Sequence, residues 1–168
     1  MPVVSLFPQD EGPLAFAKPD GSQLLVPKHR LRPWVKLGSD YQSRQAVFDT
    51  GAPCTLLSKR AWVKLAARGE VNWVLHAPNE TADRDLPKTE LLGAPRQYRI
   101  GRVRVSLVDG NRDCDLGFVL ALCLTTDSVA GAVSASVILG MCEVLNGRTV
   151  LVQASPDGAK WSAALMQP

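Results

Sequence analysis

The sequence predicts an all-β fold with one or two short helices. The chain has 168 residues, of which 46% are hydrophobic, 21% charged and 6% aromatic. This composition is typical of one globular domain whose core rests on valine, leucine and alanine. The content of Gly 13 and Pro 12 supplies the turns that short strands need. Disordered, coiled-coil and collagen-like chains are excluded, as is an enzyme with two large lobes in one chain.

Short apolar segments separated by turn signals are expected to be strands. In chain order these segments are residues 23–26, 33–37, 44–48, 98–108, 116–124 and 136–139. A C-terminal hairpin is expected to pair residues 148–153 with 160–165 across a Ser-Pro-Asp-Gly turn. Proline and glycine interrupt residues 1–30, so we expect this segment to wrap the surface.

A helix is expected at residues 59–68. Ser58 precedes it as a good N-cap, Gly69 follows where a C′ glycine belongs, and Trp62 begins one apolar stripe. A second, shorter helical turn is expected at 141–145.

The apolar residues of the 98–108 strand change parity along its length. They fall on even positions up to Ile100 and on odd positions from Val103. A β-bulge at Gly101-Arg102 would bring both sets to one face. Asp109-Gly110-Asn111 then predicts a hairpin turn into the next strand.

The charges do not indicate a nucleic-acid-binding protein. The net charge is +3, and no clear basic face with aromatic platforms is evident, so no nucleic-acid partner is expected. Four arginines between Arg96 and Arg104 have no acidic residue nearby in the sequence. We interpret them as an exposed strand face, with an adaptor for acidic partners as the alternative.

No cofactor, metal or membrane span is expected. The four cysteines, Cys54, Cys114, Cys123 and Cys142, form no Cys-x-x-Cys pair, which argues against a zinc site. The apolar run at 116–124 is far shorter than the roughly 20 residues of a spanning helix. Because the N-terminus lacks the features of a signal peptide, we expect a cytoplasmic protein with reduced thiols.

Residues 46–58 read Ala-Val-Phe-Asp-Thr-Gly-Ala-Pro-Cys-Thr-Leu-Leu-Ser. They resemble the active-site loop of retropepsin-like aspartic proteases: two apolar residues, Asp-Thr/Ser-Gly-Ala, two variable positions, Thr/Ser, then two apolar residues. About ninety residues later, Val-Ile-Leu-Gly at 137–140 resembles the second signature of that family. There Ile138, Leu139 and Gly140 would brace the catalytic loop before a short helix. The resemblance covers roughly residues 33–152 and implies a closed barrel.

The same resemblance implies an aspartic endopeptidase, a hydrolase of peptide or protein substrates. Asp49 would be catalytic, Thr50 would hydrogen-bond across two loops, and Gly51 would let the loop approach the carboxylate closely. Two carboxylates at close range share one proton and so supply both a base and an acid. The other candidate motif, Thr-Asp-Ser-Val at 126–129, lacks the glycine, so the pair requires a homodimer.

Family members also close a β-hairpin, the flap, over the substrate. Here the flap is expected within residues 79–98, with 88–97 as its candidate, and Ala52 and Gly93 as substrate-binding residues. The expected organisation is an N-terminal segment at 1–30, a retropepsin-like domain at 31–153 and a C-terminal extension at 154–168. The alternative function is a non-catalytic peptide-binding module of the same fold.

Overall fold

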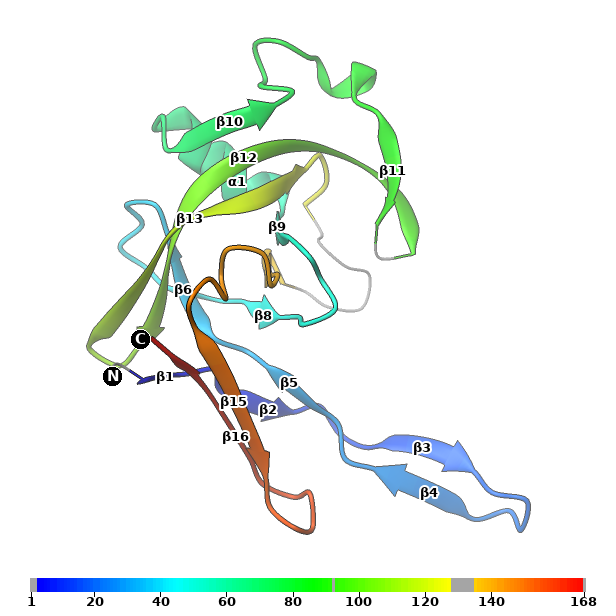
Figure 1. Cartoon of the computed structure of the whole chain (residues 1–168). Coiled ribbons are helices and arrows are strands. Elements are labelled where there is room, and N and C mark those ends of the chain that lie inside the picture. The colour runs from blue at the N-terminus through cyan, green and yellow to red at the C-terminus, as the bar shows by residue number, and fades with distance from the viewer. Residues whose placement is uncertain (1–2, 92, 128–134, 168) are drawn as a thin grey trace.

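The computed structural model describes residues 3–91, 93–127 and 135–167. Within these ranges the chain is mostly β, with one helix, α1 (Lys59–Ala67), and one short 3-10 turn, η1 (Asp83–Asp85) (Figure 1). The strands, in chain order, are β1 (Val3–Ser5), β2 (Pro8–Asp10), β3 (Leu14–Ala17), β4 (Gln23–Val26), β5 (His29–Leu31), β6 (Trp34–Leu37), β7 (Arg44–Gln45), β8 (Val47–Phe48), β9 (Thr55–Leu57), β10 (Val71–Leu75), β11 (Lys88–Leu91), β12 (Ala94–Asp109), β13 (Arg112–Leu124), β14 (Val137–Leu139), β15 (Thr149–Ala154) and β16 (Trp161–Met166). The mostly β prediction is therefore confirmed.

Most of the described strands form one large sheet. Its order is β2-β5-β8-β14-β9-β13-β12-β6-β7, and β10 and β11 also pair with β12. The expected closed barrel is not found among the described strands, because β2 and β7 end this path and each pairs on one side only. The sheet is instead strongly curved, with β12 arching over β8 and β9 (Figure 1).

The two longest strands of this sheet, β12 and β13, form one hairpin. Its two-residue turn is Gly110-Asn111, with Gly110 at φ +60, as the turn signal predicts. The predicted bulge at Gly101-Arg102 of β12 is wrong, because pairing with β13 runs without a shift from Tyr98 to Val105 and burial alternates from Arg99 to Val103. The bulge at this level lies in β10 instead, between Trp73 and Leu75. A polar side chain, Arg99, occupies the core-facing position where the sequence pattern expects an apolar one.

Helix α1 forms where the sequence predicts it and packs against β10 and β13. Ser58 caps it, with its Oγ accepting the Ala61 N–H at 3.3 Å, and Gly69 follows at φ +70. Trp62 is buried and lies edge-on against Trp73, with ring centroids 5.6 Å apart. The Trp62 indole N–H also donates to the carbonyl that ends β13 at 2.7 Å, which ties the helix to the sheet.

Of two further predicted elements, one divides in the structure and the other forms as a single turn. The expected 44–48 strand divides into β7, which pairs with β6, and β8, which pairs with β14 and β5. Residues 141–145 form the expected helical turn, with one helical bond from Leu145 N–H to the Met141 carbonyl at 3.2 Å, and do not extend into a second helix.

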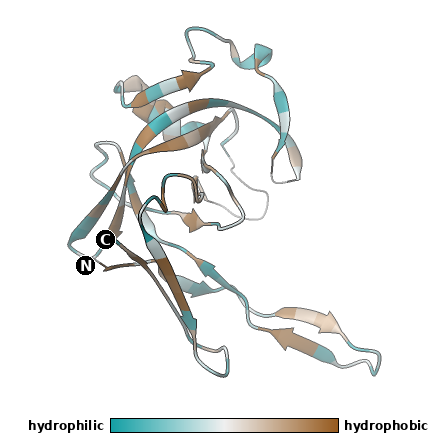
Figure 2. Ribbon diagram, in the orientation of Figure 1, coloured by the Kyte–Doolittle hydropathy of each residue, from teal (hydrophilic) through white to brown (hydrophobic). Residues whose placement is uncertain are grey.

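The N-terminal segment does more than wrap the surface. β1 pairs with β16 of the C-terminal hairpin, and β5 pairs with β8. Between them, the β3–β4 hairpin projects away from the body (Figure 1). Its apolar residues are exposed, Phe16 and Leu25 by more than half, and both strands are mostly brown in Figure 2.

Candidate active site

Asp49 lies where β8 ends. Val47 and Phe48 are buried and pair in parallel with Ile138 and Leu139 of β14. The Asp49 N–H continues this pairing by donating to the Leu139 carbonyl at 3.0 Å. Asp49 is half-buried. Its main chain continues the sheet, and the hydrogen bond that its carboxyl group accepts is exposed.

The Asp-Thr-Gly-Ala turn orients that carboxyl group. The Gly51 N–H donates to Asp49 Oδ1 at 2.8 Å, and the Ala52 N–H donates to the Asp49 carbonyl at 3.1 Å. A Cβ at Gly51 would lie 3.2 Å from the same Oδ1, tighter than ordinary contact. Glycine therefore permits the close approach of main chain and carboxylate. Thr50, beside it, is exposed.

Strand β14 supports the turn from both ends, because it lies between β8 and β9. Beyond it, Gly140 is in contact with the loop backbone: a Cβ there would lie 2.3 Å from the Cys54 carbonyl carbon and oxygen. The Gly140 N–H donates to Thr55 Oγ1 at 3.3 Å, and the Met141 N–H donates to the Ala52 carbonyl at 2.9 Å. The predicted brace residues and the Asp49 turn thus lie together.

An apolar cluster lies beneath this turn. Its buried members are Val47, Ala52, Leu56, Leu124, Ala135 and Ile138. Ala52 therefore packs inward, next to the exposed residues of the turn. Leu91, Tyr98 and Leu122 are half-buried and pack against the same cluster.

Two of these residues come from the β11–β12 hairpin, which spans the predicted flap. Lys88 pairs with Gln97, and Leu91 pairs with Ala94. Gly93 lies in the tip at φ +73, a left-handed conformation that favours glycine. The structure brings the hairpin to the site through Leu91 and Tyr98 rather than through Gly93.

Sequence reasoning missed Leu91 and Tyr98 as site residues. The sequence signal for Tyr98 was its alternation with Ile100, but the predicted bulge assigned both residues to the same face as Val103. For Leu91 the available signal was its apolar side chain at the end of the otherwise polar strand β11.

Asp127, the acidic residue of the other candidate motif, binds the N-terminal turn of helix α1. Its Oδ1 accepts the Arg60 N–H at 3.1 Å in the first turn of α1, where a negative charge is favourable. Ser128 and Val129 of the same motif lie outside the described residues.

The arginine-rich stretch is paired with acids that are distant in sequence. Arg99 bonds to Asp83, Arg102 to Glu143 and Arg104 to Asp115. The stretch is therefore not an uncompensated basic face, which removes the basis of the adaptor hypothesis. Asp115 has its pKa lowered chiefly by the hydrogen bond from Arg104.

The cysteines are free thiols. Cys54, in the turn, is half-buried, and burial is the main cause that raises its pKa, followed by the neighbouring Cys142. A raised pKa favours the thiol over the reactive thiolate. Among the described residues, no group of three or more His, Cys, Asp or Glu side chains could hold a metal ion. In the same part of the chain, no helix has the length and apolar character needed to cross a bilayer.

No protein-family model matches the sequence, and no curated protein matches it. Among solved structures, the chain is similar to a retropepsin-like aspartic protease from Rickettsia conorii, with 12% sequence identity and a TM-score of 0.43. The match covers 95% of this chain and 93% of that chain.

Proposed function

We propose that the protein is an aspartic endopeptidase whose active site forms between two copies of the chain. The observation that carries the proposal is the Asp49 turn. Its carboxylate accepts the Gly51 N–H at 2.8 Å, and its backbone is bonded to Leu139. A half-buried Asp held in this way is suited to act on a water molecule in a cleft between subunits.

The proposed chemistry needs two carboxylates that share one proton. The ionised carboxylate takes a proton from a water molecule, whose oxygen attacks the carbonyl carbon of the scissile peptide bond. The protonated carboxylate gives its proton to the carbonyl oxygen. When the tetrahedral intermediate collapses, the carboxyl group that took the water proton gives it to the amide nitrogen, and the other carboxylate takes back a proton from a hydroxyl of the intermediate. The C–N bond then breaks, which yields an acid and an amine and leaves the pair with one shared proton. The pair titrates as a unit.

The second carboxylate is proposed to be Asp49 of a second copy. Asp127 is occupied at the start of α1, and a two-fold axis would place two identical Asp49 turns face to face. In this arrangement Thr50, exposed beside Asp49, would bond across the two turns as it does in the family that the motif resembles.

The β11–β12 hairpin is proposed to be the flap, with Gly93 in its tip and a peptide strand bound beneath it. Residues 31–153 would carry the peptidase function, with 1–30 and 154–168 as flanking segments that pair with each other through β1 and β16. The proposed location is the cytoplasm, where free thiols stay reduced.

The test compares the wild type with Asp49→Asn on a peptide library, with Asp113→Asn as the matched control. Asp113 pairs with Lys36 on the surface, so this control removes a carboxylate without touching the site. We expect wild-type cleavage that rises on acidification and is lost on dilution, and a fall of at least about a thousandfold in Asp49→Asn.

The Asp113→Asn variant should cleave like the wild type. Unchanged cleavage by Asp49→Asn would refute the proposal. Equal peptide binding by wild type and Asp49→Asn, without cleavage by either, would favour the peptide-binding module instead.

A further inference from the structure

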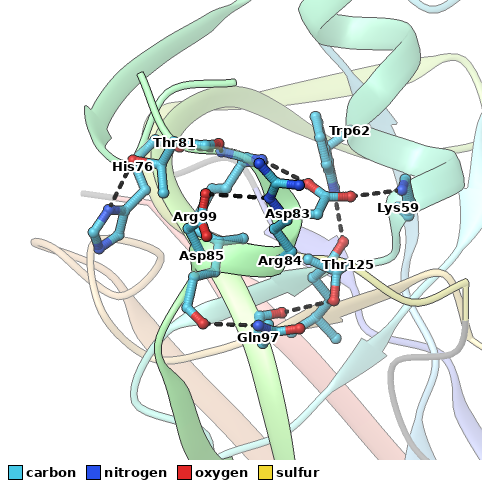
Figure 3. A network of polar contacts seen from close by, with 12 residues as sticks. Lys59, Trp62, His76, Thr81, Asp83, Arg84, Asp85, Gln97, Arg99 and Thr125 are labelled. Carbon is cyan, nitrogen blue, oxygen red and sulfur yellow. Dashed lines mark hydrogen bonds and ion pairs between the residues drawn. The ribbon is translucent and has the colours of Figure 1, made fainter. Parts of the chain in front are cut away.

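A buried arginine lies at the root of the β11–β12 hairpin, by which we mean residues 76–86 before β11 and the facing residues Gln97 and Arg99 of β12. The Arg99 side chain, on β12, is 2% exposed. Its Nη1 donates to the carbonyls of His76 and Thr81 at 2.6 and 2.7 Å, and its Nη2 donates to Asp83 Oδ1 at 2.6 Å (Figure 3). Three bonds thus gather the segment between β10 and β11 around one guanidinium, whose planar fork suits several acceptors at once.

A second side chain closes the root beside it. The Gln97 amide donates to the Leu86 carbonyl at 2.7 Å, just before β11 begins. The main-chain carbonyl of Gln97 accepts the main-chain N–H of Thr125, just after β13, at 3.1 Å (Figure 3). Beyond this point the β11 residues Lys88, Thr89 and Glu90 are exposed, so this part of the hairpin is less buried than the part next to Gln97 and Arg99.

The root is also joined to the helix that follows the Asp49 turn. Asp83 Oδ2 accepts a hydrogen bond from Lys59 Nζ at 2.9 Å, and Lys59 is the first residue of α1. Only Ser58 separates that helix from β9, which leads back to the turn. One continuous path of bonds therefore runs from Arg99 through Asp83 to the segment that follows Asp49 (Figure 3).

We infer that Arg99 is a positioning residue that fixes the root of the flap relative to the Asp49 turn, so that the flap bends beyond Gln97. This inference rests on the proposed function for the role of the hairpin as a flap. Without the three bonds of Arg99, residues 76–86 lose their common anchor and the whole segment moves with the flap. A peptide would then meet a flap that is closed in a smaller fraction of molecules, which weakens its binding.

The test is hydrogen exchange of residues 88–97 in Arg99→Lys, measured in an Asp49→Asn background so that no chain is cleaved. Lysine keeps the charge but cannot bond to three fixed acceptors in one plane. Arg104→Lys is the matched control, because Arg104 lies on the same strand and pairs with Asp115 at an exposed site. We expect exchange in the hairpin to rise roughly ten- to hundredfold in Arg99→Lys alone.

Kinetics in the otherwise wild-type chain give the second readout. KM for a cleaved peptide should rise about tenfold in Arg99→Lys while kcat stays within about twofold, because the Asp49 turn keeps its own backbone bonds. Asp83→Asn, which keeps an oxygen acceptor and loses the charge, is the milder variant to use if Arg99→Lys does not fold, and it should shift both readouts in the same direction.

The inference is overturned if the hairpin in Arg99→Lys, or in Asp83→Asn, exchanges no faster than in Arg104→Lys. It is also overturned if β14 loses protection equally, since that would indicate a merely structural residue. The exchange measurement needs no catalysis, so a chain that cleaves no peptide would refute the proposed function and leave the inference about the hairpin root to be judged on exchange.

Discussion

The Asp49 turn and the β11–β12 hairpin lie together but are held by different means. Main-chain bonds hold the turn: Asp49 to Leu139, and Ala52 to Met141. Side chains hold the hairpin root, chiefly Arg99 and Gln97. In the proposed enzyme the part that must keep its geometry is therefore built into the sheet, while the part that must move depends on a few side-chain bonds.

This difference has a physical consequence for local stability. The strands beside the turn are buried on all their residues, in β8, β9 and β14 alike, so opening the turn requires breaking the core. Beyond the root of the hairpin, Lys88, Thr89 and Glu90 are exposed and Leu91 is half-buried against the apolar cluster, so the hairpin can open with a much smaller loss of buried surface. We therefore expect the turn to exchange its amides only on global unfolding and the hairpin to exchange by local opening.

The largest expected effect breaks the turn. In Gly140→Ala the new Cβ would lie 2.3 Å from the Cys54 backbone, and backbone cannot move aside as a flexible side chain can. We expect the free energy of unfolding to fall by about 3 kcal/mol, measured by urea denaturation. Gly110→Ala is the control: it has φ +60 but nothing within 4 Å, so it should cost only about 1 kcal/mol. Equal losses in both variants would contradict close packing under the turn.

A medium effect is expected at the junction between the two regions. Ser58 is fully buried and caps α1 through its Oγ, and it stands between β9 and Lys59. Ser58→Ala should lower the free energy of unfolding by about 1 kcal/mol, measured by thermal and urea denaturation. Ser58→Thr, which can keep the cap, is the comparison. A Ser58→Ala chain as stable as the wild type would show that the cap does not contribute.

The smallest effect is a pH dependence confined to the hairpin. Hydrogen bonds from Lys59 and then Arg99 hold the pKa of Asp83 below its ordinary value of 3.8. Because the folded pKa is lowered, the stabilisation from Asp83 is present above that ordinary value and is lost as the pH falls through the lowered one.

The corresponding measurement is hydrogen exchange in acid, corrected for the intrinsic rate. Residues 88–97 should stay protected at pH 5 and lose protection a few-fold below pH 3.8, whereas β14 should not change over that range. The Asp83→Asn variant should show no such step. A step of equal size in that variant would assign the effect to another group.

The same contrast explains what the sequence predicts and what it does not. The Asp49 turn, its glycine contacts and the Ser58 cap depend on residues close in sequence or on a short recognisable pattern, so they could be predicted. The brace at Gly140 followed from the family resemblance. The closed barrel, also implied by that resemblance, is not found among the described strands, because the path ends at β2 and β7.

The hairpin root could not be predicted, because its bonds join residues that are distant in sequence and have no shared pattern. Arg99 stands on a core-facing position of β12, and its partners lie between β10 and β11. Reading the parity change as a bulge at Gly101-Arg102 was wrong for this reason. A charged residue at a core-facing position was the one visible sign that a polar network replaces apolar packing there.

The central claim, an active site shared by two Asp49 carboxylates, is tested most directly by mixing subunits. Wild-type protein is allowed to exchange subunits with an equal amount of Asp49→Asn, and peptide cleavage is compared with the same wild-type amount alone. Random pairing leaves about half of the wild-type chains with a wild-type partner. The account predicts that activity falls to about half, whereas activity that stays at the full wild-type level would contradict a shared site.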